Sequence, residues 1–372
     1  MRILHLADLH LGWLPDYLGE KRDERTVERD GLLARAADFA LDTQNGIDAV
    51  IVAGDLFEAH KPPRPLVERV INQLQRLTRA GLFVLTVPGN HDEITYHDSV
   101  FRMEASRWPG VLADNPNPQE IFRHELDGKI TAFYGLAYTG GITRTSPPLA
   151  EFPKTQADRH IGVLHGSLNW DAGDRSLPIS SEAVALSGYD YLALGHIHSH
   201  SVRYLGKTVV CYAGATEAKT FHDPGCGNFT VVAIRDDVRV AAIEANCRPC
   251  LTHNIDVSEF DHAAQVAQTI ENLADSRAMV RIILTGQSNF HLDAAMLQEK
   301  HAHLYYHLDI KSENIALDDG MIAGLAAEPT IRGHFVRNIL ARFVTAENEE
   351  DKEILRRALM HGVAALQRGE KS

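Results

Sequence analysis

The first ninety residues alternate between short apolar runs and segments whose apolar residues recur at helical spacing. The apolar runs cover residues 2–7, 48–53 and 82–87, and each is short enough to be a buried strand. The amphipathic segments between them, about 24–44 and 65–80, predict helices. Strand, helix, strand, helix, strand in this order predicts parallel βαβ units.

Beyond residue 110 the pattern changes twice. Strands dominate up to about residue 245, and a second α/β pattern with a helix over 263–274 follows. Two amphipathic helices, about 334–345 and 348–367, end the chain. We therefore expect an α/β domain over residues 1–245, a small α/β domain over 246–331 and a helical tail over 332–372. The clearest expected strands in these parts cover residues 130–136, 161–164, 191–194, 209–212, 229–234, 279–285 and 303–310.

Composition narrows the class of protein. With 372 residues, 44% of them hydrophobic and 23% charged, the chain is typical of a globular protein. It has no apolar run long enough for a membrane span and no signal peptide at its start, which predicts a cytoplasmic protein. The net charge of −13 argues against a nucleic-acid binder that relies on a basic surface. The net charge does not exclude a DNA enzyme that binds its substrate through metal ions, a local basic patch or a basic partner. The four cysteines predict ordinary thiols.

Side chains that can bind metals follow most of the expected strands. In an open α/β sheet the ligand site lies beyond the carboxyl ends of the strands, so these side chains can converge. Carboxylate, imidazole and amide groups without a thiolate suit Mn²⁺, Mg²⁺, Fe²⁺ or Zn²⁺. Their number exceeds the needs of one ion and favours two ions that share a carboxylate, an arrangement typical of phosphoryl transfer. The set is Asp8, His10, Asp55, Asn90, His91, Asp92, His165, His196 and His198.

Five short motifs carry a family resemblance. They are Asp-Leu-His (8–10), Gly-Asp-Leu-Phe (54–57), Gly-Asn-His-Asp (89–92), Leu-His-Gly (164–166) and Gly-His-Ile-His (195–198). Most of them are weak signals alone, and the motifs at 89–92 and 195–198 are stronger. Together the five stand in the order of the calcineurin-like metallophosphoesterases. The opening residues 3–12, and the segment 212–217 followed by Phe221, resemble the SbcD-type DNA repair nucleases. The resemblance implies an α/β fold: a four-layer metallophosphoesterase β-sandwich flanked by helices, with a small α/β capping domain and a helical C-terminal tail.

The resemblance also implies a role for each candidate residue. Asp8, His10 and His198 would bind one metal, Asn90, His165 and His196 would bind the other, and Asp55 would bridge both. His91 would be the general acid, with Asp92 orienting its ring. The cofactors would be two divalent ions, with Mn²⁺ favoured.

The function that this resemblance implies is a metal-dependent DNA exo/endonuclease of repair or recombination. Its partners would be DNA and an SMC-like ATPase of the SbcC type, docked by the parts beyond residue 246. A homodimer is left open, and no membrane is expected. The alternatives are a metallophosphoesterase for a smaller phosphodiester or phosphomonoester, and a scaffold without catalysis, which the intact ligand positions disfavour. The apolar stripes of the tail have an alternative role too, packing onto the protein's own second domain.

One residue departs from the family pattern, and the role of three arginines is left open by the sequence. Glu58 stands where many relatives have His. We expect its carboxylate near the rim, where it repels a DNA phosphate. Either His60 has taken over the phosphate contact or activity on duplex ends is weaker; the second is favoured and predicts that Glu58→His raises duplex degradation. Arg22, Arg25 and Arg29 either face phosphate or lie on a solvated helix start, since acidic residues alternate with them.

Overall fold

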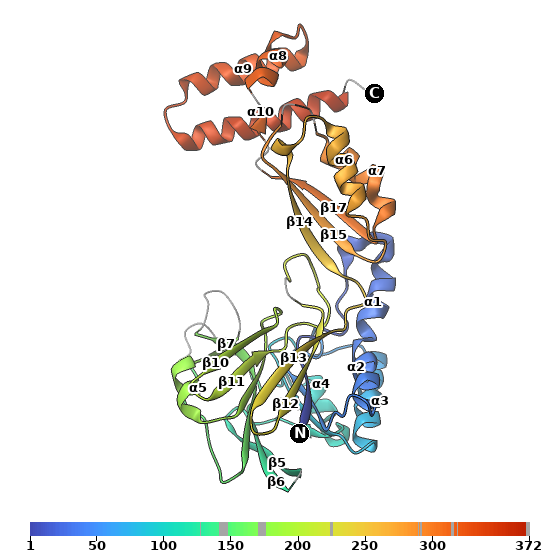
Figure 1. Cartoon of the computed structure of the whole chain (residues 1–372), viewed down its shortest axis with the longest axis vertical. Helices are drawn as coiled ribbons and strands as arrows, with labels where there is room; N and C mark the ends of the chain where they lie inside the picture. Colours follow the sequence, from blue (N-terminus) through green and yellow to red (C-terminus); the bar gives the residue numbers. More distant parts are fainter. Residues whose placement is uncertain are drawn as a thin grey trace. The chain divides into compact units, whose positions relative to one another are not determined.

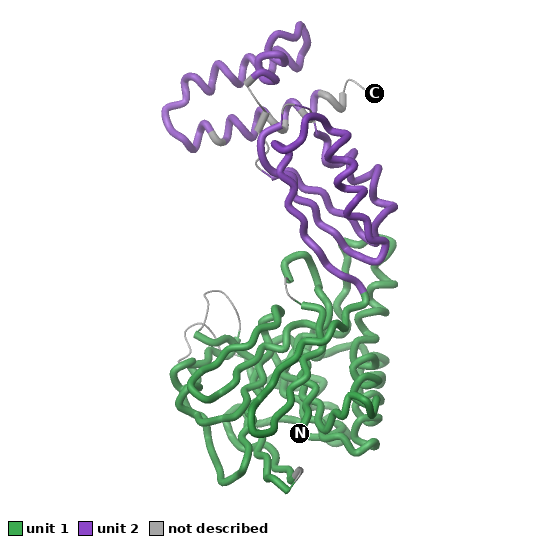
Figure 2. Tube along the Cα trace, in the orientation of Figure 1, with its two compact units in different colours: residues 1–247 green, residues 248–372 purple. Residues whose placement is uncertain are grey.

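The computed structural model divides the chain into two compact units, residues 1–247 and 248–372 (Figure 2). Each unit is described by itself. The residues described are 1–126, 128–140, 148–169, 176–223, 226–288, 290, 292–313, 316–317 and 319–369. The last three residues of the expected tail, 370–372, lie outside this set.

The first sheet of unit 1 contains the predicted βαβ strands. Its β1, β2, β3 and β4 are parallel, and β12 and β13 extend it in antiparallel fashion beside β1 (Figure 1). The parallel strands β1, β2 and β3 match the three apolar runs of the first ninety residues. In spatial order the strands are β13 (Val238–Glu244), β12 (Asn228–Ile234), β1 (Arg2–Leu6), β2 (Ala49–Ala53), β3 (Phe83–Val87) and β4 (Val111–Leu112).

The second sheet of unit 1 is built from the strand-rich middle of the chain. Its central strands β6, β7, β9 and β11 are parallel, and β5 and β10 are antiparallel edges. The short β8 pairs with β7 alone. In spatial order the strands are β10 (Ser201–Leu205), β11 (Thr208–Tyr212), β9 (Tyr191–Gly195), β7 (Arg159–Leu168), β6 (Lys129–Gly135) and β5 (Gln119–Leu126), with β8 at Leu177–Ile179.

Apolar side chains of both sheets meet in a shared core. Ile51 and Val87 of the first sheet belong to the same buried cluster as Ile161 and Ala193 of the second. The outer face of the first sheet packs on α2 and α3, and the outer face of the second packs near α5. The result is the four-layer β-sandwich that the sequence predicted. The helices of unit 1 are α1 (Arg22–Asp30), α2 (Leu32–Leu41), α3 (Arg64–Arg79), α4 (Val100–Met103) and α5 (Ser181–Ser187).

The helix predicted over residues 24–44 is two helices. α1 ends at Asp30, whose carboxylate accepts a hydrogen bond from the backbone N–H of Gly12 at 2.8 Å. Gly31 follows, and α2 begins at Leu32. Glycine is a poor helix former, so the chain breaks here while the apolar spacing continues across the break.

Unit 2 has its own small sheet and two groups of helices. Its strands β14, β15 and β17 are all parallel, and the α6 and α7 side chains pack on them. The helices α8, α9 and α10 share a separate cluster. The strands are β14 (Cys250–Asp256), β15 (Met279–Thr285), β16 (Gln287–Ser288), β17 (His307–Ser312) and β18 (Ala316–Leu317), and the helices are α6 (Ala263–Asn272), α7 (Ala294–His301), α8 (Asp319–Ala327), α9 (Ile331–Thr345) and α10 (Glu349–Gly369).

Within the described part of the chain, no helix has both the length and the apolar character that a membrane crossing requires.

Candidate metal centre

The loops after β1 and β2 run side by side and are joined by backbone hydrogen bonds. Asp8 N–H donates to Gly54 O at 3.2 Å, and His10 N–H donates to Asp55 O at 3.0 Å. This pairing continues the parallel sheet past the ends of its strands. It therefore brings the first two motifs together at the carboxyl edge, as the strand order predicts.

One group of candidate ligands surrounds His10. Asp8, His10 and His198 offer donor atoms that all lie within 4.8 Å of one another. The Nε2 atoms of His10 and His198 face each other at 3.1 Å. Asp8 and His10 are fully buried, and His198 is partly buried. We call these three residues the His10 half.

A second group surrounds His165. The Oδ1 atom of Asn90 lies 2.9 Å from Nε2 of His165 and 3.0 Å from Nδ1 of His196. The backbone N–H of His196 donates to both carboxylate oxygens of Asp8, which links the two groups. We call Asn90, His165 and His196 the His165 half.

Asp55 lies between the two halves. Its Oδ2 atom is 3.7 Å from Nε2 of His10 and 3.4 Å from Nε2 of His165. Burial by itself raises the pKa of Asp55, but the adjacent histidines, His165 first, hold it well below its usual range. Asp55 is therefore an anion, in a position to contact two cations at once.

The donor set fits divalent cations on chemical grounds. A carboxylate only accepts hydrogen bonds, so His198, whose Nδ1 lies 2.7 Å from Asp223, carries a proton on Nδ1. Nδ1 of His10 lies 2.8 Å from Oε2 of Glu58. Burial lowers the pKa of His10 to about 4, so its Nε2 presents a lone pair to His198. Burial also lowers the pKa of His165, but Asp55 outweighs it and raises that pKa to about 9. The Nε2 lone pair of His10 and the negative charge of Asp55 are thus donors that a cation can bind.

The backbone at the centre is strained. Of the five non-glycine residues with positive φ in the described part of the chain, four are candidate ligands: Asp8 (53°), His10 (47°), Asp55 (50°) and His196 (95°). Such conformations cost on the order of 1–3 kcal/mol each and concentrate at functional sites.

Glycines make the close approach possible. A Cβ on Gly54 would clash with the His165 ring, and one on Gly89 would clash with Asp55. Only Gly54 of this pair has a positive φ. Gly89 therefore serves by leaving room for Asp55, and not by forming the sharp left-handed turn that glycine often supplies.

His91 and Asp92 lie differently from expectation. The carboxylate of Asp92 accepts hydrogen bonds from the backbone N–H groups of Phe57 at 3.1 Å and Gly89 at 2.7 Å. Among the described residues, the hydrogen-bond partner of the His91 ring is the carbonyl oxygen of Glu58, 3.0 Å from Nδ1. The expectation that Asp92 orients this ring is therefore wrong, because Asp92 binds the two loops and Glu58 holds the ring.

Glu58 also lies differently from expectation. Its Oε2 is 2.8 Å from Nδ1 of His10, and both of its oxygens accept hydrogen bonds from Nζ of Lys219 at 3.0 and 2.8 Å. Burial raises the pKa of Glu58, but the contact with His10 outweighs it and lowers the pKa to about 2. The carboxylate is thus engaged with a candidate ligand and neutralised by a lysine, rather than exposed to repel a phosphate.

Asp223 and Lys219 are functional residues that sequence reasoning missed. Asp223 contacts His198 and accepts hydrogen bonds from the backbone N–H groups of Lys219 and Thr220, both at 2.9 Å. A carboxylate behind a ligand histidine fixes the ring and raises its basicity. The signal in the sequence was the family-like segment 212–217 followed by Phe221, which gave no role to Lys219 or Asp223.

Two arginines of α1 anchor this segment. Arg25 donates to the Glu217 carboxylate at 2.6 Å, and Arg29 donates to the carbonyl oxygens of Leu9 and Ala218 at 3.0 and 2.7 Å. Arg25 is 1% exposed and Arg29 is 0% exposed. They neither face phosphate nor lie in solvent, so both readings of the sequence were wrong for these two residues.

Comparisons with known proteins agree with the site. The chain is 25% identical over 303 residues to an uncharacterized metallophosphoesterase, YhaO, of Bacillus subtilis. This alignment covers 77% of this chain and 72% of that protein. It is 30% identical over 229 residues to the DNA double-strand break repair protein Mre11 of Aeropyrum pernix, covering 58% of this chain and about half (53%) of that protein. It is 26% identical to the Mre11 protein of Halobacterium salinarum, covering 77% of this chain and 71% of that protein. The calcineurin-like phosphoesterase family model matches residues 1–200, more than half of the chain. The chain belongs to the calcineurin-like phosphoesterase family.

Proposed function

We propose that the chain is a metal-dependent phosphodiesterase that cleaves DNA as an exo- or endonuclease. The observation that supports this most is the convergence of Asp8, His10, Asp55, Asn90, His165, His196 and His198 at one sheet edge. When bound, two divalent cations supply the charge that activates a water molecule and stabilises the leaving oxygen of a phosphoryl transfer. The bridging role of Asp55 and the preference for Mn²⁺ belong to this proposal.

His91 is the proton donor in this scheme. Because its Nδ1 donates to the Glu58 carbonyl, Nε2 is the atom that delivers a proton to the leaving oxygen. Its side chain is 37% exposed, so a substrate can reach it. Asp92 contributes by holding the loop that carries His91.

DNA as the substrate is supported by the relatives and by the opening motif. Two of the relatives described above are named for DNA double-strand break repair. The net charge of −13 means that attraction of a polyanion rests on the metal ions or on a partner. YhaO, which aligns over 77% of the chain, is not named for DNA repair. A smaller phosphoester is therefore the alternative substrate.

A comparison of substrates tests the proposal. Purified protein with Mn²⁺ is incubated with linear duplex DNA, with single-stranded DNA and with bis(p-nitrophenyl) phosphate, in parallel with Asp55→Asn. We expect degradation of DNA that the variant lacks. Hydrolysis of the small diester with both DNAs left intact would favour the smaller-substrate enzyme. The same assay with Mg²⁺, Fe²⁺ and Zn²⁺ ranks the metals.

We also propose that the helices after Arg332 dock an SMC-like ATPase. Val336, Leu359 and Val363 bury one another beside α8, so part of the apolar stripes packs inside unit 2. Val344 of α9 and Ile354 of α10 stay 85% and 58% exposed. A chain that ends at Arg332 should retain hydrolysis of the small diester and lose co-purification with the ATPase, whereas retained co-purification would contradict the docking role. The cytoplasmic location and a homodimer stay predictions of the sequence.

A further inference from the structure

A second charged pocket lies at the opposite ends of the strands that carry the metal ligands. It encloses about 490 Å³, within the range of small-molecule sites. Arg2 begins β1 and Arg159 begins β7, and both line it. His165 is six residues further along β7, which places the two sites about 20 Å apart along that strand. The pocket is therefore distinct from the metal centre.

Cations outnumber anions in this pocket. Arg2, Lys129, Arg159 and Arg235 line it together with Asp48 and Asp236. The Asp48 Oδ2 atom is used by the backbone N–H of Arg2, at 2.7 Å. Within the described ranges, no ion pair joins any of the four cations to a carboxylate. The side chains of the lining thus carry a net charge of two positive units, in a chain whose net charge is −13.

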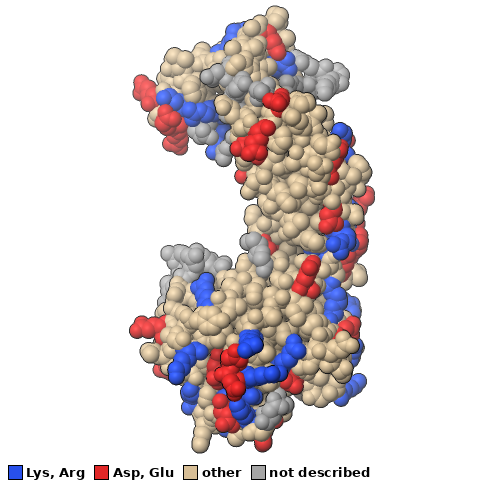
Figure 3. All heavy atoms as spheres, in the orientation of Figure 1, with Lys and Arg blue, Asp and Glu red and all other residues tan. Residues whose placement is uncertain are grey.

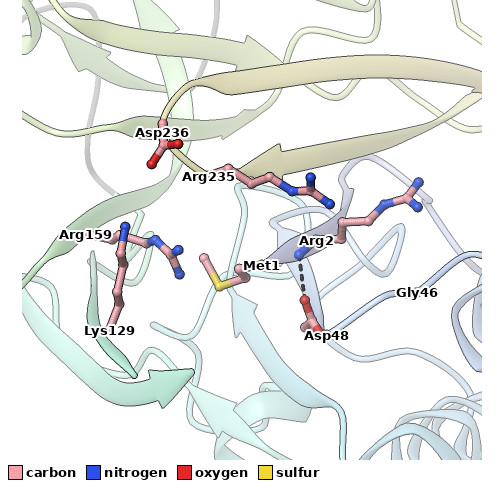
Figure 4. A pocket seen from close by; sticks show the side chains of 8 residues that line it. All are labelled: Met1, Arg2, Gly46, Asp48, Lys129, Arg159, Arg235 and Asp236. Atoms are coloured by element: carbon pink, nitrogen blue, oxygen red, sulfur yellow. Dashed lines mark hydrogen bonds between the residues drawn. The ribbon is translucent and has the colours of Figure 1, made fainter. Parts of the chain in front are cut away.

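Arg159 is the central residue of the pocket. It is only 6% exposed, and its Nε and Nη1 atoms are buried without a hydrogen-bond partner in the described structure. Figure 4 shows its guanidinium directed into the pocket toward Met1. A buried guanidinium without a partner is strongly unfavourable, and native proteins satisfy such groups with a partner or a ligand. Arg159 therefore presents two buried N–H donors at the inner end of the pocket.

The lining of the pocket is exposed at one end and buried at the other. Figure 3 shows basic and acidic side chains gathered around the part of unit 1 formed by β12 and β13. Arg235 and Asp236 belong to the turn between these strands, and both are exposed. The pocket is thus open at this turn and closed at Arg159. Such a shape admits a small ligand whose charged end points inward.

We propose that this pocket binds a small phosphorylated anion, either free phosphate or a phosphate monoester. A phosphate monoester carries close to two negative charges at neutral pH, which balances the lining. The planar guanidinium forms paired hydrogen bonds with phosphate oxygens, a geometry that Arg159 and Arg235 can supply. The proposal does not depend on the substrate of the metal centre.

Calorimetry on the full chain tests the proposal. Protein is freed of metal by chelation and dialysis, so that phosphate does not bind through metal ions. It is then titrated with inorganic phosphate and, separately, with adenosine monophosphate. We expect saturable binding with one site per chain. Equal Kd values for the two ligands identify free phosphate as sufficient, and tighter binding of the nucleotide identifies a monoester. Absence of saturable binding by both overturns the proposal.

Variants locate the site. Arg159→Gln should raise Kd about tenfold or more, because it removes a charge-assisted contact from a buried position. Arg239→Gln is the matched control: Arg239 lies on the same hairpin as Arg235, is 80% exposed and pairs with Asp237 outside the pocket. An unchanged Kd in Arg159→Gln, or an equal loss in the control, contradicts the assignment.

A second measurement covers the case in which Arg159→Gln folds poorly. Lys129→Gln changes an exposed lining residue, so it should fold normally and raise Kd by a few-fold. Phosphate should also raise the melting temperature of the metal-free wild type and raise that of Lys129→Gln less. Equal stabilisation of the two proteins would place the bound anion elsewhere.

Discussion

The two halves of the metal centre are supported in different ways. In the His10 half, the imidazoles of His10 and His198 are backed by the carboxylates of Glu58 and Asp223. In the His165 half, Nδ1 of His165 is backed by the carbonyl oxygen of Ala53, the last residue of β2, at 2.9 Å. One half is thus held by side chains on loops, and the other by the main chain of a central strand.

This difference means that substitutions can change the support of one half of the centre more easily than that of the other. A backbone carbonyl persists whichever side chain the strand carries, so the His165 half is fixed by the sheet. Glu58 and Asp223 can each be changed by one substitution, and Lys219 contacts both, through Nζ and through its backbone N–H. The His10 half is therefore the adjustable one, and the predictions below test that asymmetry.

The largest effect is expected where the halves meet. Asp55→Asn removes the anion that lies 3.7 Å from His10 and 3.4 Å from His165. Turnover should fall more than about 10⁴-fold, since the change removes metal charge as well as the alignment that general acid catalysis needs. Elemental analysis should find at least one ion lost per chain.

The control for this change is Asp237→Asn, an exposed carboxylate paired with Arg239. It should leave metal content and turnover unchanged. Two ions retained by Asp55→Asn would contradict a bridging role.

A smaller effect is expected at His91, which lies beside the His10 half. His91→Asn should lower turnover about 10²–10⁴-fold on DNA and less on a p-nitrophenyl diester, whose leaving group needs no proton. Metal content should stay at the wild-type value, although His91 offers a nitrogen within 4.8 Å of the His10 and Asp55 donor atoms. Loss of an ion would make His91 a ligand instead of an acid. His97→Asn, whose side chain is 94% exposed, is the control.

The asymmetry between the halves also explains what the sequence could predict. Strand ends are marked by apolar runs, and parallel topology makes the residues that follow them converge, so Asp8, Asp55 and His165 could be found from spacing. The four-layer sandwich followed from the same pattern together with the family resemblance. The backbone carbonyl behind His165 needs no sequence signal at all, because any strand supplies it.

The supporting side chains could not be found in this way. Asp223 lies in a segment without a strand or helix, 25 residues after His198. Arg25 and Arg29 alternate with acidic residues, a pattern typical of solvated helices, yet tertiary contacts with Glu217 and main-chain oxygens bury them. Glu58 contacts Lys219, which is 161 positions away in the sequence. A pattern of neighbouring residues does not predict such a long-range contact.

The smallest effect, and the sharpest test of the asymmetry, is expected at Glu58. Glu58→Gln keeps the shape of the side chain but removes the negative charge behind His10. This should weaken the ion of the His10 half about 10–100-fold, the usual cost of losing the group behind a ligand histidine, and leave the ion of the His165 half unchanged. A manganese titration that resolves two binding constants measures both. Glu68→Gln, which removes the charge of a carboxylate that is paired with Arg107 and lies on α3, is the matched control. Glu58→His should lower duplex degradation rather than raise it, because it places an imidazole where His10 and Lys219 both require an anion. Equal weakening of the two ions by Glu58→Gln would show that the halves are not independently supported.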